Sequence, residues 1–180
     1  MDDAELKKYC IRAVEEGITH ARPIDPATVV TAPWVRMKCQ FGCPGYDRSY
    51  CCPPHTPTPD QTRSILDSYR RAILFHIEAP YAPDRGKRIE KSYQRLVALE
   101  GEIFKDGYYR ALLFLAGPCR LCKECARLKN EPCTFGDKAR PSMEACGIDV
   151  YATARNNGFP IQPLRDKKET QNHYCLMLVD

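Results

Sequence analysis

Two cysteine-rich loops constrain what this chain can fold into more than any other feature of its sequence. The first loop, residues 21–59, holds four cysteines, and its five prolines from Pro44 to Pro59 exclude a long helix or a central strand. The second loop, residues 117–140, holds four more cysteines. Loops this long need something to organise them, and a bound metal group would do so.

The eleven cysteines are better suited to metal binding than to disulfides, because 11 of 180 residues is a lower density than in small disulfide-stapled secreted domains. Residues 1–20 contain no apolar run of signal-peptide length. The longest apolar stretch, residues 111–116, is too short to cross a bilayer. We therefore expect a cytoplasmic protein with no membrane partner, whose cysteines stay reduced and bind metal.

The formal net charge of +4 does not by itself predict a nucleic-acid partner. Lysine and arginine are scattered, without a run of five or six like charges. A four-thiolate iron–sulfur cluster carries roughly −2 in its oxidised state, so two clusters would bring the molecule near neutrality. The basic residues are then compensation for cluster charge, and we expect no nucleic-acid partner.

The hydrophobic pattern predicts one compact domain over residues 1–180, of the α/β or α+β class, with a central mixed sheet and flanking helices. Two continuous apolar runs separated by a long amphipathic helix imply a parallel pair of strands joined by a right-handed crossover. The expected helices are residues 3–16, one capped by Asp60, residues 84–107 and one from Met143 to Ala154; the expected strands are residues 72–77, 108–116, 159–164 and 174–179.

The second cysteine group consists of Cys119, Cys122 and Cys125, followed by Cys133. Three cysteines spaced by two residues let one tight loop present three thiolates to a cubane, as in bacterial ferredoxins, and the fourth completes the site. This spacing predicts a [4Fe–4S] cluster. Zinc is the alternative, although a zinc site normally uses two Cys-x-x-Cys pairs separated by a longer loop.

The first cysteine group consists of Cys39, Cys43 and the adjacent pair Cys51 and Cys52. Adjacent thiols rarely bind one ion together, and Cys52 is the better ligand because Pro53 and Pro54 hold its backbone extended. Cys51 or His55 could be a fourth ligand. With only three ligands, one iron would stay open to bind substrate as a Lewis acid; the alternative is a closed structural zinc or iron–sulfur site.

The remaining polar and cysteine residues fit ordinary roles. Ser142 is a plausible helix cap, and Arg140 beside it either faces a cluster or belongs to a simple helix start. We expect three further cysteines to be small core residues. They are Cys10, Cys146 and Cys175.

Together the two groups resemble the predicted metal-binding proteins of domain-of-unknown-function family 2284. The matching residues are Cys39, Cys43, Tyr46, Cys52-Pro-Pro54, Cys119-x-x-Cys122-x-x-Cys125, Cys133, Arg140-Pro-Ser-Met-Glu-Ala145 and Gly147-Ile-Asp149. This resemblance implies an iron–sulfur protein of the kind found mainly in anaerobic bacteria and archaea, with no agreed activity. It also marks Cys51 and Cys146 as additions to the family pattern.

We therefore expect a redox protein in which two [4Fe–4S] clusters pass electrons to or from a redox partner protein. Cys119, Cys122, Cys125 and Cys133 would bind one cluster, and Cys39, Cys43 and Cys52, with Cys51 as a further candidate, the other. One alternative is an enzyme whose N-terminal cluster binds a small sulfur- or oxygen-containing ligand at an open iron. Another is a zinc-binding interaction module. No catalytic residue is predicted.

Overall fold

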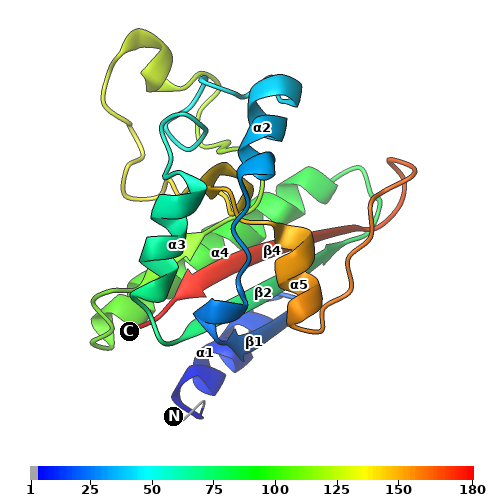
Figure 1. Ribbon diagram of the computed structural model, residues 1–180. Helices are drawn as coiled ribbons and strands as arrows, with labels where there is room; N and C mark the ends of the chain where they lie inside the picture. The colour runs from blue at the N-terminus through cyan, green and yellow to red at the C-terminus, as the bar shows by residue number, and fades with distance from the viewer. Residues whose placement is uncertain (1–3) are drawn as a thin grey trace.

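The computed structural model describes residues 4–180 and contains one four-stranded sheet, in the order β1–β2–β4–β3 (Figure 1). Every pair of neighbouring strands is antiparallel. The strands are β1 (His20–Ile24), β2 (Ala72–Ala79), β3 (Leu112–Phe114) and β4 (Gln171–Leu178). The helices are α1 (Ala4–Glu15), α2 (Pro33–Gly42), α3 (Pro59–Asp67), α4 (Arg85–Lys105) and α5 (Val150–Asn156), with 3₁₀ turns η1 (Pro26–Thr28), η2 (Ala126–Lys129) and η3 (Glu144–Cys146).

The predicted α+β class is confirmed, but the predicted parallel pair is wrong. Strands β2 and β3 run in the same direction, yet β4 lies between them and pairs antiparallel with both. An unbroken apolar run indicates that both faces of a strand are buried, and it carries no information on the direction of the neighbour. The sheet is therefore antiparallel rather than mixed.

The sheet separates two hydrophobic layers, which explains the unbroken apolar runs. Ile73 and Phe75 of β2 pack with α1 and α4 on one face. Leu74 between them packs with α3, η3 and α5 on the other face, together with Leu176 of β4. Alternate residues of each central strand thus enter different layers, as the pleat of a β-strand requires.

Most of the predicted helices are present, but they begin and end at other residues than predicted. The helix predicted over residues 3–16 is α1, although residue 3 lies outside the described part of the chain. Helix α3 begins with a capping box between Thr58 and Gln61 rather than at Asp60. The helix predicted over residues 143–154 divides into η3 and α5, because Gly147 between them adopts a φ of 78°.

Two elements differ from the expectation. Residues 159–164 form no strand, and Pro160 and Pro163 in that segment lack the N–H groups that a ladder needs. Helix α2 was not predicted. It begins at Pro33, which occupies the first turn, but only Val35 of the helix is buried, so no hydrophobic periodicity reveals it.

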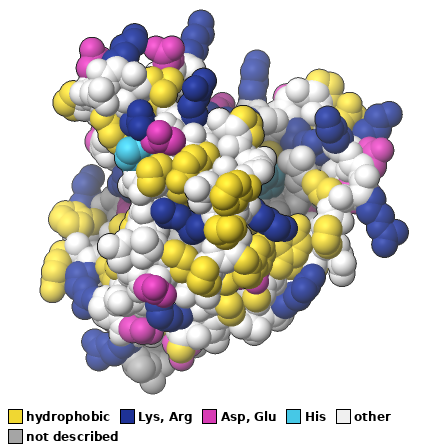
Figure 2. Space-filling model, turned by 45° about the horizontal axis from the view of Figure 1, so that its top comes forward, with side chains coloured by type: hydrophobic (Ala, Val, Ile, Leu, Met, Phe, Trp, Pro, Cys, Tyr) yellow, Lys and Arg dark blue, Asp and Glu magenta, His cyan; other side chains and the backbone are white. Residues whose placement is uncertain are grey.

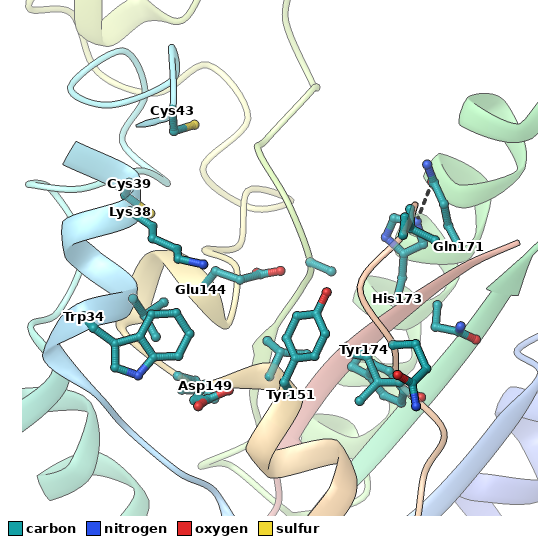
Figure 3. A pocket seen from close by; sticks show the side chains of 18 residues that line it. Trp34, Lys38, Cys39, Cys43, Glu144, Asp149, Tyr151, Gln171, His173 and Tyr174 are labelled. Carbon is teal, nitrogen blue, oxygen red and sulfur yellow. Dashed lines mark hydrogen bonds between the residues drawn. The ribbon is translucent and has the colours of Figure 1, made fainter. Parts of the chain in front are cut away.

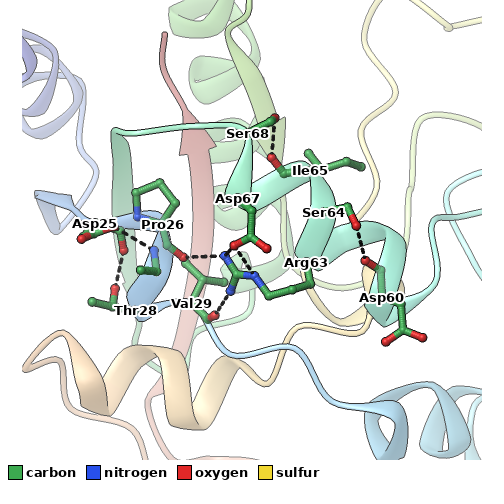
Figure 4. A network of polar contacts seen from close by, with 11 residues as sticks. Asp25, Pro26, Thr28, Val29, Asp60, Arg63, Ser64, Ile65, Asp67 and Ser68 are labelled. Atoms are coloured by element: carbon green, nitrogen blue, oxygen red, sulfur yellow. Dashed lines mark hydrogen bonds and ion pairs between the residues drawn. The ribbon is translucent and has the colours of Figure 1, made fainter.

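Arg63 of α3 fixes the turn that leads from β1 toward α2 (Figure 4). Its Nη1 donates to the carbonyl oxygen of Val29 at 2.7 Å, and its Nη2 donates to that of Pro26 at 3.2 Å. Asp67, one helical turn along, accepts from the Nε of Arg63 at 2.8 Å. This guanidinium therefore ties the first cysteine loop to the sheet domain at its start.

Glu100 fixes the end of the second cysteine loop. This buried carboxylate of α4 accepts from the backbone N–H of Leu113 in β3 at 2.8 Å and from the Nε of Arg140 at 2.7 Å. Arg140 also donates to the carbonyl oxygens of Asp137 and Ala139. The side chain of Arg140 thus pins its loop to α4.

Among the described residues, none of the helices has the length and apolarity needed to span a membrane.

Replacing Arg140 with alanine should lower the free energy of unfolding by about 2–3 kcal/mol. The change leaves the carboxylate of Glu100 buried without its cation. The loss of folding free energy is smaller than for a fully buried ion pair, because Arg140 is partly exposed. Urea unfolding of the metal-free protein measures it, with Lys138→Ala on the exposed surface of the same loop as control. Equal midpoints for the two variants would contradict this role.

Candidate metal centre

The two cysteine loops lie side by side at one end of the molecule (Figure 1). The hydroxyl of Tyr50 in the first loop donates to the carbonyl oxygen of Glu131 in the second at 2.8 Å. Arg127 of η2 pairs with Asp47 of the first loop. His55 Nε2 lies 2.8 Å from Asp47 Oδ1. These contacts clamp together two segments that are far apart in the sequence.

Arg36 holds α2, and with it Cys39, in place. Its Nη1 lies within 2.8–3.1 Å of the carbonyl oxygens of Thr56, Pro57 and Ala145. One guanidinium thus joins α2 to the end of the first loop and to η3. The sequence reasoning missed Arg36, because an arginine that binds carbonyl groups has no spacing signature.

Backbone hydrogen bonds fold the first loop into consecutive turns. The N–H of Cys43 donates to the carbonyl oxygen of Cys39 at 3.3 Å, where α2 ends. The N–H of Asp47 donates to Pro53 at 2.7 Å, and the N–H of Cys52 donates to Ser49 at 3.0 Å. The loop therefore returns on itself and brings Cys52 back toward Cys43.

Cys43 and Cys52 both lie close to Gly45. A Cβ atom at Gly45 would stand 3.5 Å from the Sγ of Cys43 and 3.8 Å from the Sγ of Cys52. The N–H of Gly45 also approaches the sulfur of Cys43 at 3.4 Å. Cys39 interacts electrostatically with Cys43 and with Cys52. The three thiols line a cradle that a side chain at position 45 would begin to fill.

The second loop carries the other four cysteines. Burial, followed by Cys119, Cys125 and Cys133, raises the pKa of Cys122. That these four bind one metal group stays a prediction. Cys122 is exposed, and the other three are half-buried.

Cys51 and Cys52 are adjacent in the sequence, and both are buried. Cys119 in the second loop and burial raise the pKa of Cys51, and Cys133 adds to the effect. Cys52 interacts most strongly with Cys43 and Cys39, and more weakly with Cys119. The adjacent residues Cys51 and Cys52 thus lie where the two cysteine groups meet.

Crowding and burial hold several of these thiols in the protonated form. Burial, followed by repulsion from Cys43 and Cys39, raises the pKa of Cys52 to about 11. Burial and Cys43 also raise the pKa of Cys39. Hydrogen bonding to Cys119 raises the pKa of Cys51, and the same bond lowers the pKa of Cys119 to about 6. A bound cation would relieve this repulsion, because metal ligands are thiolates.

The donor set fits a thiolate-bound metal group. All eight predicted site cysteines carry free thiols, and their interactions form one connected set across both loops. Within residues 4–180, no three histidine, cysteine, aspartate or glutamate side chains converge tightly enough to hold a single ion. The division of the eight thiols into ligand sets therefore stays a prediction.

The other three cysteines lie in the core, as predicted. Cys10 of α1 belongs to the hydrophobic layer that also contains residues of α4, Cys175 is fully buried in β4, and Cys146 is fully buried at the end of η3. Ser142 is not the helix cap that was predicted: its hydroxyl accepts from the N–H of Ala145 at 3.1 Å, but the cap position of η3 is Met143, and the side chain of Asp149 caps α5.

A cavity of about 480 Å³ opens beside the first cysteine group (Figure 3). Cys39 and Cys43 lie at one side, and the side chains of Glu144 and Tyr151 point toward the space between them and His173. Burial raises the pKa of Glu144, and its Oε2 accepts from the N–H of Gly117 at 3.4 Å. This volume falls within the range of about 300–1,000 Å³ that is typical of small-molecule sites.

The surface around the site carries both signs of charge. Figure 2 shows lysine and arginine dispersed over one face, with acidic side chains among them and exposed apolar side chains between. Trp34, Met37 and Phe41 are the exposed apolar residues of α2. The face shown has no single basic patch.

The family model of the predicted metal-binding proteins of domain-of-unknown-function family 2284 matches residues 22–179. The chain belongs to this family. The matched range covers nearly all of the described fold, including the cysteines of both loops and the residues that line the cavity. Metal binding is thus supported by the family and by the thiol set. No curated protein and no solved structure matches the chain.

The affinity of the metal-free protein for Co²⁺ should rise with pH between about pH 6 and 8. The raised pKa values of Cys39 and Cys52 keep these thiols protonated there, so each must lose a proton to bind. Affinity then increases about tenfold per pH unit for each proton released. Titration of the thiolate-to-cobalt absorption measures it. Cys52→Ser should reduce the slope, Cys10→Ser should not, and an affinity independent of pH would contradict the account.

Proposed function

We propose that this protein carries two [4Fe–4S] clusters and transfers single electrons to or from a partner protein. Cys119, Cys122, Cys125 and Cys133 are the proposed ligands of one cluster. Cys39, Cys43 and Cys52 are the proposed protein ligands of the other. When bound, such clusters supply one-electron redox chemistry at a potential tuned by charge, hydrogen bonds and exposure.

The observation that carries the proposal is the packing of two loops with four cysteines each against one another, held by the contacts of Tyr50 with Glu131 and of Arg127 with Asp47. Two four-coordinate zinc ions and two cubanes can each use eight thiolates, so the number of thiols does not decide between them. The triplet Cys119-x-x-Cys122-x-x-Cys125 is the spacing of a cubane loop. This spacing favours an iron–sulfur cluster over zinc, whose sites normally use two Cys-x-x-Cys pairs separated by a longer loop.

The contacts that hold the two loops together support an electron-transfer role. Tyr50 and Glu131, with Arg127 and Asp47, hold the two cysteine groups against each other. Cys52 interacts with Cys119 and Cys125 across the junction, so the two proposed sites are near neighbours. The exposed Cys122 brings the second site to the surface, where a partner protein can approach.

Protein purified without oxygen should be brown, absorb near 400 nm and contain about eight irons and eight sulfides per chain. Cys119→Ser should remove about half of the iron, and Cys39→Ser the other half, because each variant lacks a ligand of one site only. Cys175→Ser in β4 is the control and should keep the full content. Colourless protein that contains zinc would contradict both iron–sulfur readings and favour the zinc-binding module.

A second candidate function is that of an enzyme whose N-terminal cluster has an open iron. The cavity beside Cys39 and Cys43 favours it, because a three-thiolate site next to such a cavity leaves room for a small ligand. Glu144 and Tyr151 offer polar contacts to a sulfur- or oxygen-containing molecule there.

Cyanide should alter the spectrum of the N-terminal cluster alone if that cluster has an open iron. The response should persist in Cys119→Ser, which keeps the N-terminal site, and vanish in Cys39→Ser. Electron paramagnetic resonance of the reduced protein distinguishes the two clusters. A response that survives Cys39→Ser, or no response in the unaltered protein, would leave only the electron-transfer role.

A further inference from the structure

Helix α2 turns its large apolar side chains toward solvent, which is the reverse of an ordinary surface helix. Trp34, Met37 and Phe41 are 46%, 53% and 72% exposed. At 3.6 residues per turn, these three positions fall within about 60° of the helix circumference, so they form one stripe along α2. Apolar surface that is grouped in this way is typical of a site that contacts another molecule.

The opposite side of α2 holds the helix on the molecule. Val35 is the buried residue of the helix, and the guanidinium of Arg36 donates to three backbone carbonyl groups of other segments. Cys39 lies on this side as well, because helical spacing places positions 35, 36 and 39 away from the stripe. The attachment of α2 therefore does not depend on the stripe.

The stripe lies beside the first cysteine group. Cys39 is on the other side of the same helix, at a distance of about one helix diameter, roughly 10 Å. Cys43 is the residue that caps the C-terminus of α2. A protein seated on the stripe would thus be separated from the first cysteine group by little more than the thickness of α2.

The charges around the stripe favour an acidic partner. None of the ten residues of α2 is acidic, and the Nζ of Lys38 lies 5.1 Å from the ring centre of Trp34. The two cysteine loops, residues 21–59 and 117–140, hold ten lysines and arginines against five acidic residues. Bound clusters would offset much of this excess, but Lys38 lies outside, on the stripe itself. A second copy docked symmetrically on the stripe would oppose Lys38 to Lys38, so an acidic protein fits better.

We propose that the exposed stripe of α2 is the docking surface for a small acidic carrier protein that exchanges single electrons at the first cysteine group. This inference rests on the proposed function and names the class of partner that the function requires. Apolar side chains in the centre of such an interface supply affinity, and complementary charge speeds encounter. In each exchange in one direction, the carrier is oxidised by one electron and this protein is reduced by one, with no bond broken.

The probe is a flavodoxin, an acidic carrier whose fully reduced flavin becomes a blue semiquinone when it loses one electron. Stopped-flow absorbance of the semiquinone measures the second-order rate constant of electron transfer to the protein purified without oxygen. Calorimetry with oxidised flavodoxin measures binding without electron transfer. Phe41→Glu places a negative charge in the stripe, and Phe41→Ser removes only the apolar group. Tyr109→Glu is the matched control, because Tyr109 is 73% exposed and precedes β3, whereas the second loop follows β3.

Phe41→Glu should lower both the rate constant and the affinity for flavodoxin by at least about tenfold, and Phe41→Ser should lower them less. Tyr109→Glu should keep both values within about twofold, because it adds the same charge away from the stripe. Reduced methyl viologen, a small donor that needs no docking surface, should reduce all four proteins equally. Iron content and the urea midpoint should not change, because Phe41 is exposed.

Equal losses in Phe41→Glu and Tyr109→Glu would overturn the proposal. So would an unaltered protein that accepts electrons from viologen but neither binds flavodoxin nor accepts electrons from it. Binding to anionic lipid vesicles, or a dimer in size-exclusion chromatography, that is lost in Phe41→Glu and kept in Tyr109→Glu would assign the stripe to a membrane or to a second copy instead. An iron-free protein that viologen does not reduce would remove the proposed function together with this inference.

Discussion

Mutual repulsion among crowded thiolates is the constraint on which the cysteine-rich end of this molecule depends. Burial and neighbouring sulfurs raise the pKa values of Cys39, Cys51 and Cys52, with Cys119 of the other loop the main cause at Cys51. Full ionisation of this set requires compensating positive charge, which iron or zinc supplies when bound. The remainder of the chain serves to bring these thiols together and keep them there.

The sheet domain provides the rigid base for the two loops. Its strands are buried on both faces, and three arginines attach the loops to it at separate points. Arg63 fixes the segment before α2, Arg36 fixes α2 itself, and Arg140 fixes the end of the second loop through Glu100. The loops have little hydrophobic core of their own, so these polar anchors replace the packing that positions ordinary elements.

The sequence predicted the family, the α+β class and the burial of Cys10, Cys146 and Cys175, because apolar surroundings are a local signal. The two ligand sets that cysteine spacing indicates stay a prediction. Strand direction was wrong, because the apolar run of β2 reports burial on two faces and the pairing with β4 is set by a segment about a hundred residues away. Helix α2 buries only Val35, and Arg36 acts on carbonyl oxygens, so neither left a periodic pattern. The contacts of Tyr50 with Glu131 and of Arg127 with Asp47 depend on how the two loops pack, which the spacing within either loop does not encode.

The central claim is that the eight thiols serve two separate iron–sulfur clusters rather than single ions. Diffraction from crystals grown without oxygen, recorded on both sides of the iron absorption edge, tests it directly. The account predicts two cubanes, one bound by Cys119, Cys122, Cys125 and Cys133 and one by Cys39, Cys43 and Cys52, with Cys51 as the further candidate ligand of the latter. A single tetrahedral zinc ion, or one cluster that takes ligands from both loops, would contradict it.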